Sequence, residues 1–306
     1  MTDGRIRSGS VILLKVRIGI SLGAGDPAGF AAAVDLLEAT GVDSLWLPEH
    51  VYAEAIEPFT GIAFALARTR RLKAGSGISV LPGRHPVLVA KQLASLAGLA
   101  QGRVLPVFGL RPAFAAERGL FPVPAGQRAA VFDEALTLLR LLLTSASVTF
   151  SGSFFSVADA SVGPLPAKPL DIWLGGSAPA ALRRVGRLAD GWLGSLLTPQ
   201  EAGEAVRVIA GAAGEAGREM DPDHFGISLP VAFGGVPAAL ARAIGQRRPG
   251  VAPDSLVADG WPGARRMILS YQAAGLSKFV VRAATAPTSF EEFVAAFADE
   301  LMPLQT

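Results

Sequence analysis

A histidine and a glycine-rich turn are the residues of this 306-residue sequence whose types and positions best fit chemistry. His50 follows the apolar run 45–47, and an imidazole can exchange a proton near neutral pH. A histidine that is merely hydrogen-bonded within a loop is the alternative. Because the apolar run is predicted to be a strand, and catalytic residues of barrel enzymes follow strand ends, we favour a catalytic role for His50.

The turn is Gly175-Gly176-Ser177, between an apolar run and a predicted helix that opens with Ser177 as its cap and Pro179 in its first turn. Such a turn exposes backbone N–H groups at the positive end of a helix, where phosphate binds. A tight turn that uses glycine for its positive φ explains the same residues equally well. Gly234-Gly235, at a later strand end, is a weaker rival for phosphate.

Other polar residues mostly have structural explanations. His224 lies in a polar turn, whereas His85 opens a helix near the predicted cofactor face and keeps both interpretations open. Arginines at 183, 184 and 187 are interpreted as the outer face of one helix. The chain has no cysteine, no His-Glu-x-x-His and no Walker motif, so we predict no metal site.

The segment Gly75-Ser76-Gly77 begins like a dinucleotide-binding fingerprint, but the third glycine is missing and the segment lies inside a predicted strand. We therefore reject a Rossmann fold. Glycines within a strand more often mark a bulge or the close approach of a ligand.

Eight short apolar runs, each followed by a loop and a helical pattern, supply the framework for these residues. They are 17–22, 43–47, 72–80, 103–108, 170–175, 191–196, 225–233 and 278–282. Alternation of strand and helix indicates a parallel sheet, and eight units close a barrel. We predict an α/β fold, a single (β/α)8 TIM-barrel domain over residues 1–306.

Helix-start signals support the barrel interpretation. Two of the segments between predicted strands are longer than one loop and one helix require. Asp26-Pro27, Thr198 with Glu201, and Ser289 with Glu292 are predicted helix caps. Residues 109–168, after strand 4, and 234–277, after strand 7, are predicted insertions, the first with a helix at 127–143 and a hairpin at 148–157. Residues 1–16 are interpreted as an extension before the first strand.

Composition narrows the range of partners. The formal net charge is +2, and basic residues are spread along the chain, which argues against nucleic acid or an anionic membrane surface as the main partner. The apolar run 11–14 is too short for a membrane span and precedes no cleavage pattern. We expect a cytoplasmic enzyme that acts on a small molecule.

Seven segments in chain order resemble the luciferase-like monooxygenase superfamily, and more closely its coenzyme F420-dependent oxidoreductases. They are DSLWLPEH (43–50), GISVLP with RHP (77–82 and 84–86), KQLASL (91–96), FDEAL (132–136), PAKP (166–169), DIWLGG (171–176) and LADGWL (188–193). The match runs from residue 17 to residue 282, and its order over eight units is more specific than any one motif.

The resemblance implies a (β/α)8 barrel that binds F420 or FMN at its C-terminal face, commonly as a homodimer. It implies cofactor phosphate on the backbone of Gly175, Gly176 and Ser177. It also implies a non-proline cis peptide at Gly77-Ile78 supporting the cofactor ring, and it places Gly109, at the end of strand 4, among the cofactor-binding residues. His50 corresponds to the strand-end histidine beside the ring.

One departure from the F420 enzymes concerns the loop after the fourth strand. Sugar-phosphate dehydrogenases of this kind carry a glycine-rich turn followed by a glutamate that is proposed to donate a proton. Here residues 108–112 contain no carboxylate, and Glu117 lies downstream. The same chemistry on the same sugar phosphate is therefore not expected.

Cofactor identity decides the reaction class, because F420 transfers hydride whereas reduced FMN also reacts with oxygen. Arginine makes up 23 of the 28 basic residues, as in proteins from GC-rich genomes such as those of many F420-producing actinobacteria, which favours F420. An FMN-dependent monooxygenase is the main alternative. A non-catalytic flavin or F420 carrier, and a sugar-phosphate isomerase or aldolase using Gly234-Gly235, are further hypotheses.

Overall fold

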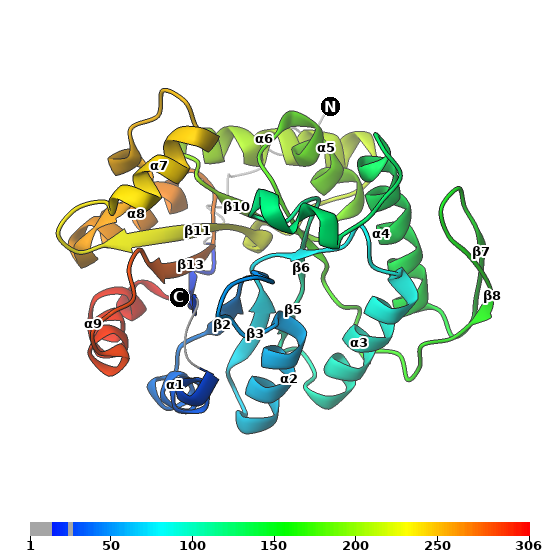
Figure 1. Cartoon of the computed structure of the whole chain (residues 1–306), viewed down its shortest axis with the longest axis horizontal. Helices are drawn as coiled ribbons and strands as arrows, with labels where there is room; N and C mark the ends of the chain where they lie inside the picture. The colour runs from blue at the N-terminus through cyan, green and yellow to red at the C-terminus, as the bar shows by residue number, and fades with distance from the viewer. Residues whose placement is uncertain (1–13, 24–26) are drawn as a thin grey trace, which may run out of the picture.

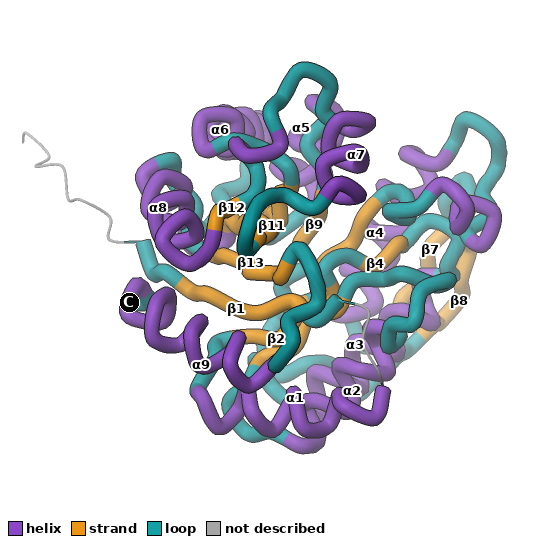
Figure 2. The backbone as a smooth tube through the Cα atoms, turned by 60° about the vertical axis from the view of Figure 1, so that its left-hand side comes forward, coloured by secondary structure: helices purple, strands orange, loops and turns teal. Residues whose placement is uncertain are grey.

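The structure is a computed structural model that describes residues 14–23 and 27–306. Its centre is a parallel sheet surrounded by helices (Figure 1), and Figure 2 shows the same arrangement from another side. The sheet strands are β1 (Arg17–Ser21), β2 (Ser44–Leu47), β3 (Lys73–Ser76), β4 (Ser79–Val80), β5 (Val104–Leu105), β6 (Val107–Gly109), β9 (Trp173–Gly175), β10 (Gly191–Ser195), β11 (Phe225–Ala232) and β13 (Lys278–Ala283).

These strands close into a ring. β1 pairs with both β2 and β13, β11 pairs with both β13 and β10, and β9 pairs with both β10 and β6. The third and fourth barrel strands are each interrupted, and their halves pair separately, β3 with β5 and β4 with β6. The predicted eight-stranded barrel is thus confirmed, with the break in the third strand falling at Gly77-Ile78.

Helices follow the strands as the alternation predicts. They are α1 (Pro27–Thr40), α2 (Pro58–Arg68), α3 (Pro86–Leu99), α4 (Arg128–Thr144), α5 (Pro179–Leu188), α6 (Pro199–Glu215), α7 (Ala238–Arg247), α8 (Gly260–Ala273) and α9 (Phe290–Leu301). On α1, Phe30, Val34 and Leu37 form the buried apolar face that packs into the core.

Of the predicted helix caps, one is confirmed in full, one in part, and one is wrong. Thr198 and Glu201 form the expected reciprocal capping box on α6. At α9, Ser289 accepts the N–H of Glu292, but its hydroxyl donates to Glu291, so only half of the box forms. Ser177 does not cap α5: the N-cap is Ala178, and no side chain bonds there, because the helix begins at Pro179. Asp26 lies outside the described residues, as do residues 1–13 of the predicted extension.

The two long intervals carry additional elements. The first holds the 3-10 helix η1 (Ala115–Leu120), α4, and the antiparallel hairpin β7 (Val148–Ser151) and β8 (Ser156–Ala160), which lies at the edge of the molecule in Figure 1. The second holds α7, the 3-10 helix η3 (Pro253–Ser255), the strand β12 (Ala258–Asp259), which pairs with β11, and α8. β12 was not among the predicted strands and lies within the predicted insertion at residues 234–277.

An ionic cluster lies at the N-terminal end of the barrel strands. Asp43 receives the ammonium groups of Lys278 at 2.6 Å and Lys73 at 2.7 Å, and Arg17 lies 3.9 Å away. Burial alone would raise the pKa of Asp43, but the two lysines outweigh it and lower the pKa to about 2. This carboxylate therefore neutralises the buried ammonium of Lys278 and the partly exposed ammonium of Lys73.

Replacing Asp43 with asparagine should lower the free energy of unfolding by about 3 kcal/mol, because the lysines lose their counter-charge. Urea unfolding measures this. Since the folded state lowers the pKa of Asp43 from 3.8 to about 2, the wild type should also lose about 2 kcal/mol as the pH falls through that window, and the variant should not.

The matched control is Asp35→Asn, which breaks an exposed ion pair with Arg68 on the surface. Exposed pairs contribute little to stability, so this variant should unfold much as the wild type does. Equal unfolding of the Asp43 and Asp35 variants would contradict the assignment of a structural role to the cluster.

Candidate active site

The break in the third barrel strand forms the floor of the candidate site. The Gly77-Ile78 peptide is cis, as the resemblance implies, and both residues are half-buried. A Cβ on Gly109 would lie 2.0 Å from Cδ1 of Ile78, and one on Gly175 would lie 3.1 Å from its Cγ2. Glycine at both positions therefore leaves room for the Ile78 side chain between the ends of β6 and β9.

Glu49 ties this floor to the end of β2. Its carboxylate pairs with the guanidinium of Arg84 at 2.7 Å and accepts the N–H of Val80 at 2.8 Å, while its own N–H donates to the carbonyl of Ile78. The side chain is buried, and its partners occupy both carboxylate oxygens. Glu49 thus holds the strand break in place, and His50, the next residue, is fixed relative to it.

His50 is half-buried, and its ring meets Phe114 edge-on with the ring centroids 4.9 Å apart. No hydrogen-bond partner of the imidazole lies in the part of the chain that the structure describes. Burial lowers the pKa of His50, and the cations Arg282 and Arg247 lower it further, while Glu117 and Glu49 oppose them. A neutral imidazole at pH 7 with a free ring nitrogen can accept a proton.

Glu117 is the residue at this site that the sequence did not assign. It lies on η1, is 1% exposed, and accepts the N–H of Tyr52 with Oε1 at 3.0 Å. Its Oε2 is buried without a hydrogen-bond partner. The loop after β6 therefore does return a carboxylate to the neighbourhood of His50, downstream of residues 108–112, because Glu117 on η1 bonds to Tyr52 in the loop after β2.

The turn after β9 is exposed at the start of α5. Gly176 has φ +114°, and its carbonyl accepts the indole N–H of Trp192 at 2.8 Å, which fixes the turn. Ser177 is exposed, and neither its N–H nor its hydroxyl has a partner among the described residues. These groups at the N-terminus of a ten-residue helix can take an anion.

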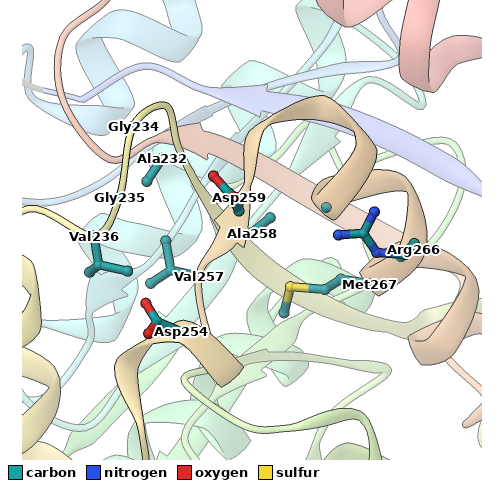
Figure 3. A pocket seen from close by; sticks show the side chains of 11 residues that line it. Ala232, Gly234, Gly235, Val236, Asp254, Val257, Ala258, Asp259, Arg266 and Met267 are labelled. Atoms are coloured by element: carbon teal, nitrogen blue, oxygen red, sulfur yellow. The ribbon is translucent and has the colours of Figure 1, made fainter.

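A groove of about 450 Å³ runs from this turn between α5 and α6. Its lining residues are Ser177, Ala178, Leu182, Leu197, Gln200, Glu201, Glu204, Ala205 and Arg248. The rival Gly234-Gly235 turn opens instead into a separate cavity of about 570 Å³ (Figure 3). Asp254, Asp259 and Arg266 line that cavity, just as Glu201, Glu204 and Arg248 line the groove, so the charge of the walls does not separate the two turns.

The structure places the remaining polar candidates elsewhere. His85 is the N-cap of α3, where its Nδ1 accepts the N–H of Val87, and Nδ1 of His224 lies 2.9 Å from the carbonyl of Asp190. Arg184 is not on an outer face as predicted: it is buried and pairs with Asp133, because α5 packs against α4 at that position.

Two kinds of feature are absent from residues 14–23 and 27–306. No three side chains of the histidine, aspartate or glutamate type gather there as a metal site would require. None of the helices in these ranges is long and apolar enough to cross a bilayer.

Comparison with known proteins identifies the family. The model of the luciferase-like monooxygenase family matches residues 6–286, so the chain belongs to this family. An uncharacterized protein of Mycobacterium tuberculosis (strain H37Rv) is 36% identical over 174 residues, which are 57% of this chain and 60% of that protein. An F420-dependent glucose-6-phosphate dehydrogenase of Beutenbergia cavernae is 33% identical over 178 residues, 55% of this chain and 52% of the enzyme. The chain thus spans little more than half the length of these relatives.

Solved structures agree on the fold. An F420-dependent secondary alcohol dehydrogenase in complex with an F420-acetone adduct superposes with a TM-score of 0.80 at 19% identity, over 96% of this chain and 100% of the other. The oxygenating constituent of 3,6-diketocamphane monooxygenase of Pseudomonas putida, in complex with FMN, gives 0.74 at 17% identity, over 96% and 99%. Both cofactor types therefore occur on this barrel.

Proposed function

We propose that this protein is an oxidoreductase that transfers hydride between coenzyme F420 and a small organic substrate. The observation that carries the proposal is the neutral, unpartnered imidazole of His50, held by Glu49 beside the glycine-bounded floor at Gly77-Ile78. A proton acceptor next to the half-buried floor at Gly77-Ile78 is what a hydride transfer from an alcohol needs, since the hydroxyl proton must leave as the hydride does.

The residues of the bed fit a ring with a phosphate-bearing tail. Ile78, flanked by Gly109 and Gly175, would support the ring, and the free N–H and hydroxyl of Ser177 would hold the phosphate. F420, when bound, supplies a carbon centre that gives or takes a hydride. We favour F420 over FMN because the Beutenbergia cavernae relative is named for F420 and the composition is arginine-rich.

Glu117 would set the protonation state of His50. Its buried carboxylate raises the pKa of the imidazole that burial and the two arginines lower, so it makes the ring a stronger base. With one oxygen bonded to Tyr52 and the other free, Glu117 can also accept a hydrogen bond from a group in the site. The carboxylate replaces the one missing from residues 108–112.

Replacing Glu117 with glutamine should lower the pKa of His50 further, because the opposing charge disappears while Gln can still accept the Tyr52 N–H. In the direction of substrate oxidation, activity requires the neutral imidazole and falls as the pH drops through its pKa. The acidic limb of the kcat/KM profile should therefore move to lower pH in the variant. A limb that stays in place or moves to higher pH would contradict this role.

The direct test of the proposal is an anaerobic assay in which F420 absorbance is followed with the purified protein over a panel of alcohols, aldehydes and enones. Reversible change of the F420 spectrum with at least one substrate supports it. Tight binding of F420 without turnover across the panel indicates a carrier, and oxygen consumption with reduced FMN indicates a monooxygenase. The predicted homodimer and cytoplasmic location are further proposals, which sizing and fractionation of the protein would test.

A further inference from the structure

Arg282 lies at the C-terminal end of β13, and its side chain faces the interior of the barrel mouth. Side chains alternate along a strand, so residues two apart face the same side. Lys278 reaches Asp43, and Val280 packs in a cluster with residues of β2, β6, β9 and β10, which can meet only inside the ring. Arg282 is the next residue of this inward row, above Val280.

The guanidinium of Arg282 is half-buried and forms no hydrogen bond or ion pair with the described residues. Burial lowers its pKa, and the neighbouring cation Arg247 lowers it further. Arg247 itself, at the end of α7, donates to the carbonyl of Ala113 and so spans the mouth between α7 and the loop after β6. A desolvated cation without a counter-charge is costly, and here the exposed cation Arg247 adds to the positive potential around Arg282.

The charged groups around Arg282 do not neutralise its positive charge. Of the two carboxylates near His50, Glu49 is committed to Arg84 and the backbone, and Glu117 lies beyond ion-pair distance of Arg282. The cofactor phosphate would lie at β9, which β10 and β11 separate from β13 in the ring. An anion that balances Arg282 would therefore belong to another molecule at the mouth, next to His50 and the exposed ring of Phe114.

We propose that the substrate of this site is an organic acid, whose carboxylate binds Arg282 while its apolar part lies against Phe114 and its reacting carbon lies near His50. A guanidinium presents a planar fork that matches one carboxylate. The half-exposed ring of Phe114, which contacts His50, suits a hydrocarbon or aromatic body better than a sugar. This inference rests on the proposed function for the reaction, but the binding of the anion is separate from it.

The test is calorimetric titration of the F420-loaded, full-length protein with benzoate and with benzamide, which share a shape and differ in charge. The wild type should bind benzoate at least about 10-fold more tightly than benzamide. Arg282→Gln should lose that preference. Arg266→Gln, which changes an exposed arginine in the Figure 3 cavity, should keep it and is the matched control.

Each other outcome overturns the inference. Equal binding of the two probes by the wild type, or a preference that survives in Arg282→Gln, removes the assignment, and tighter binding of inorganic phosphate than of benzoate excludes the carboxylate class. F420 is titrated separately with each variant. If Arg282→Gln loses affinity for F420 instead, Arg282 belongs to the cofactor bed; if even the wild type binds no F420, the proposed function fails while the benzoate preference still tests Arg282.

Discussion

Replacing His50 with alanine should lower kcat about 100-fold or more, the range lost when a positioned acid-base group is removed. The affinity for F420 should change little, because His50 is held beside the floor and has no bond to the residues that form it. The imidazole is neutral at pH 7, since burial lowers its pKa, and only a base within the site can take the substrate proton there. Steady-state kinetics and an F420 fluorescence titration of the same preparation separate the two effects.

The control for His50 is His85→Ala. That histidine caps α3 with its Nδ1, so its loss should cost some stability and leave kcat nearly unchanged. Turnover of the His50 variant at the wild-type rate would contradict the assignment. If the variant loses F420 affinity as strongly as it loses turnover, His50 binds the cofactor and is not the proton acceptor.

Replacing Ser177 with glutamate should weaken F420 binding by about 100-fold, because a carboxylate close to the phosphate repels it at a partly exposed surface. The exposed side chain tolerates the change, and Ser177 makes no bond that the variant would break. The loss should shrink in high salt. Fluorescence titration of F420 at two ionic strengths measures both effects.

Val236→Glu is the matched control, since it places the same charge beside Gly234-Gly235 in the rival cavity. This variant should bind F420 as the wild type does. The reverse pattern, with binding lost in Val236→Glu and kept in Ser177→Glu, would move the phosphate to the turn after β11.

The barrel was predictable because its signals are local. Each strand is a short apolar run and each helix has its own start, so the order of eight units follows from the sequence alone. The predicted N-cap was wrong where two neighbouring residues could each begin a helix. At α5 both Ser177 and Ala178 precede Pro179, and the backbone uses Ala178 as the cap, which leaves Ser177 free.

The site was less predictable because it depends on contacts distant in sequence. His50, Gly109 and the glycine turn were found through motifs. The structural role of Glu49 depends on its ion pair with Arg84, and the position of Glu117 near His50 depends on its hydrogen bond to Tyr52. Arg184 shows the same limit: its partner Asp133 lies on another helix, so helical periodicity alone placed it on the wrong face.

The most direct test of the central claim is a parallel fluorescence titration of the purified protein with F420 and with FMN, followed by the same titration of Ser177→Glu. We expect saturable binding of F420, weaker binding of FMN, and loss of F420 binding in the variant. No binding of F420 by the wild type, or F420 binding that the substitution leaves unchanged, would contradict the account of Gly175-Gly176-Ser177 as the phosphate end of an F420 site.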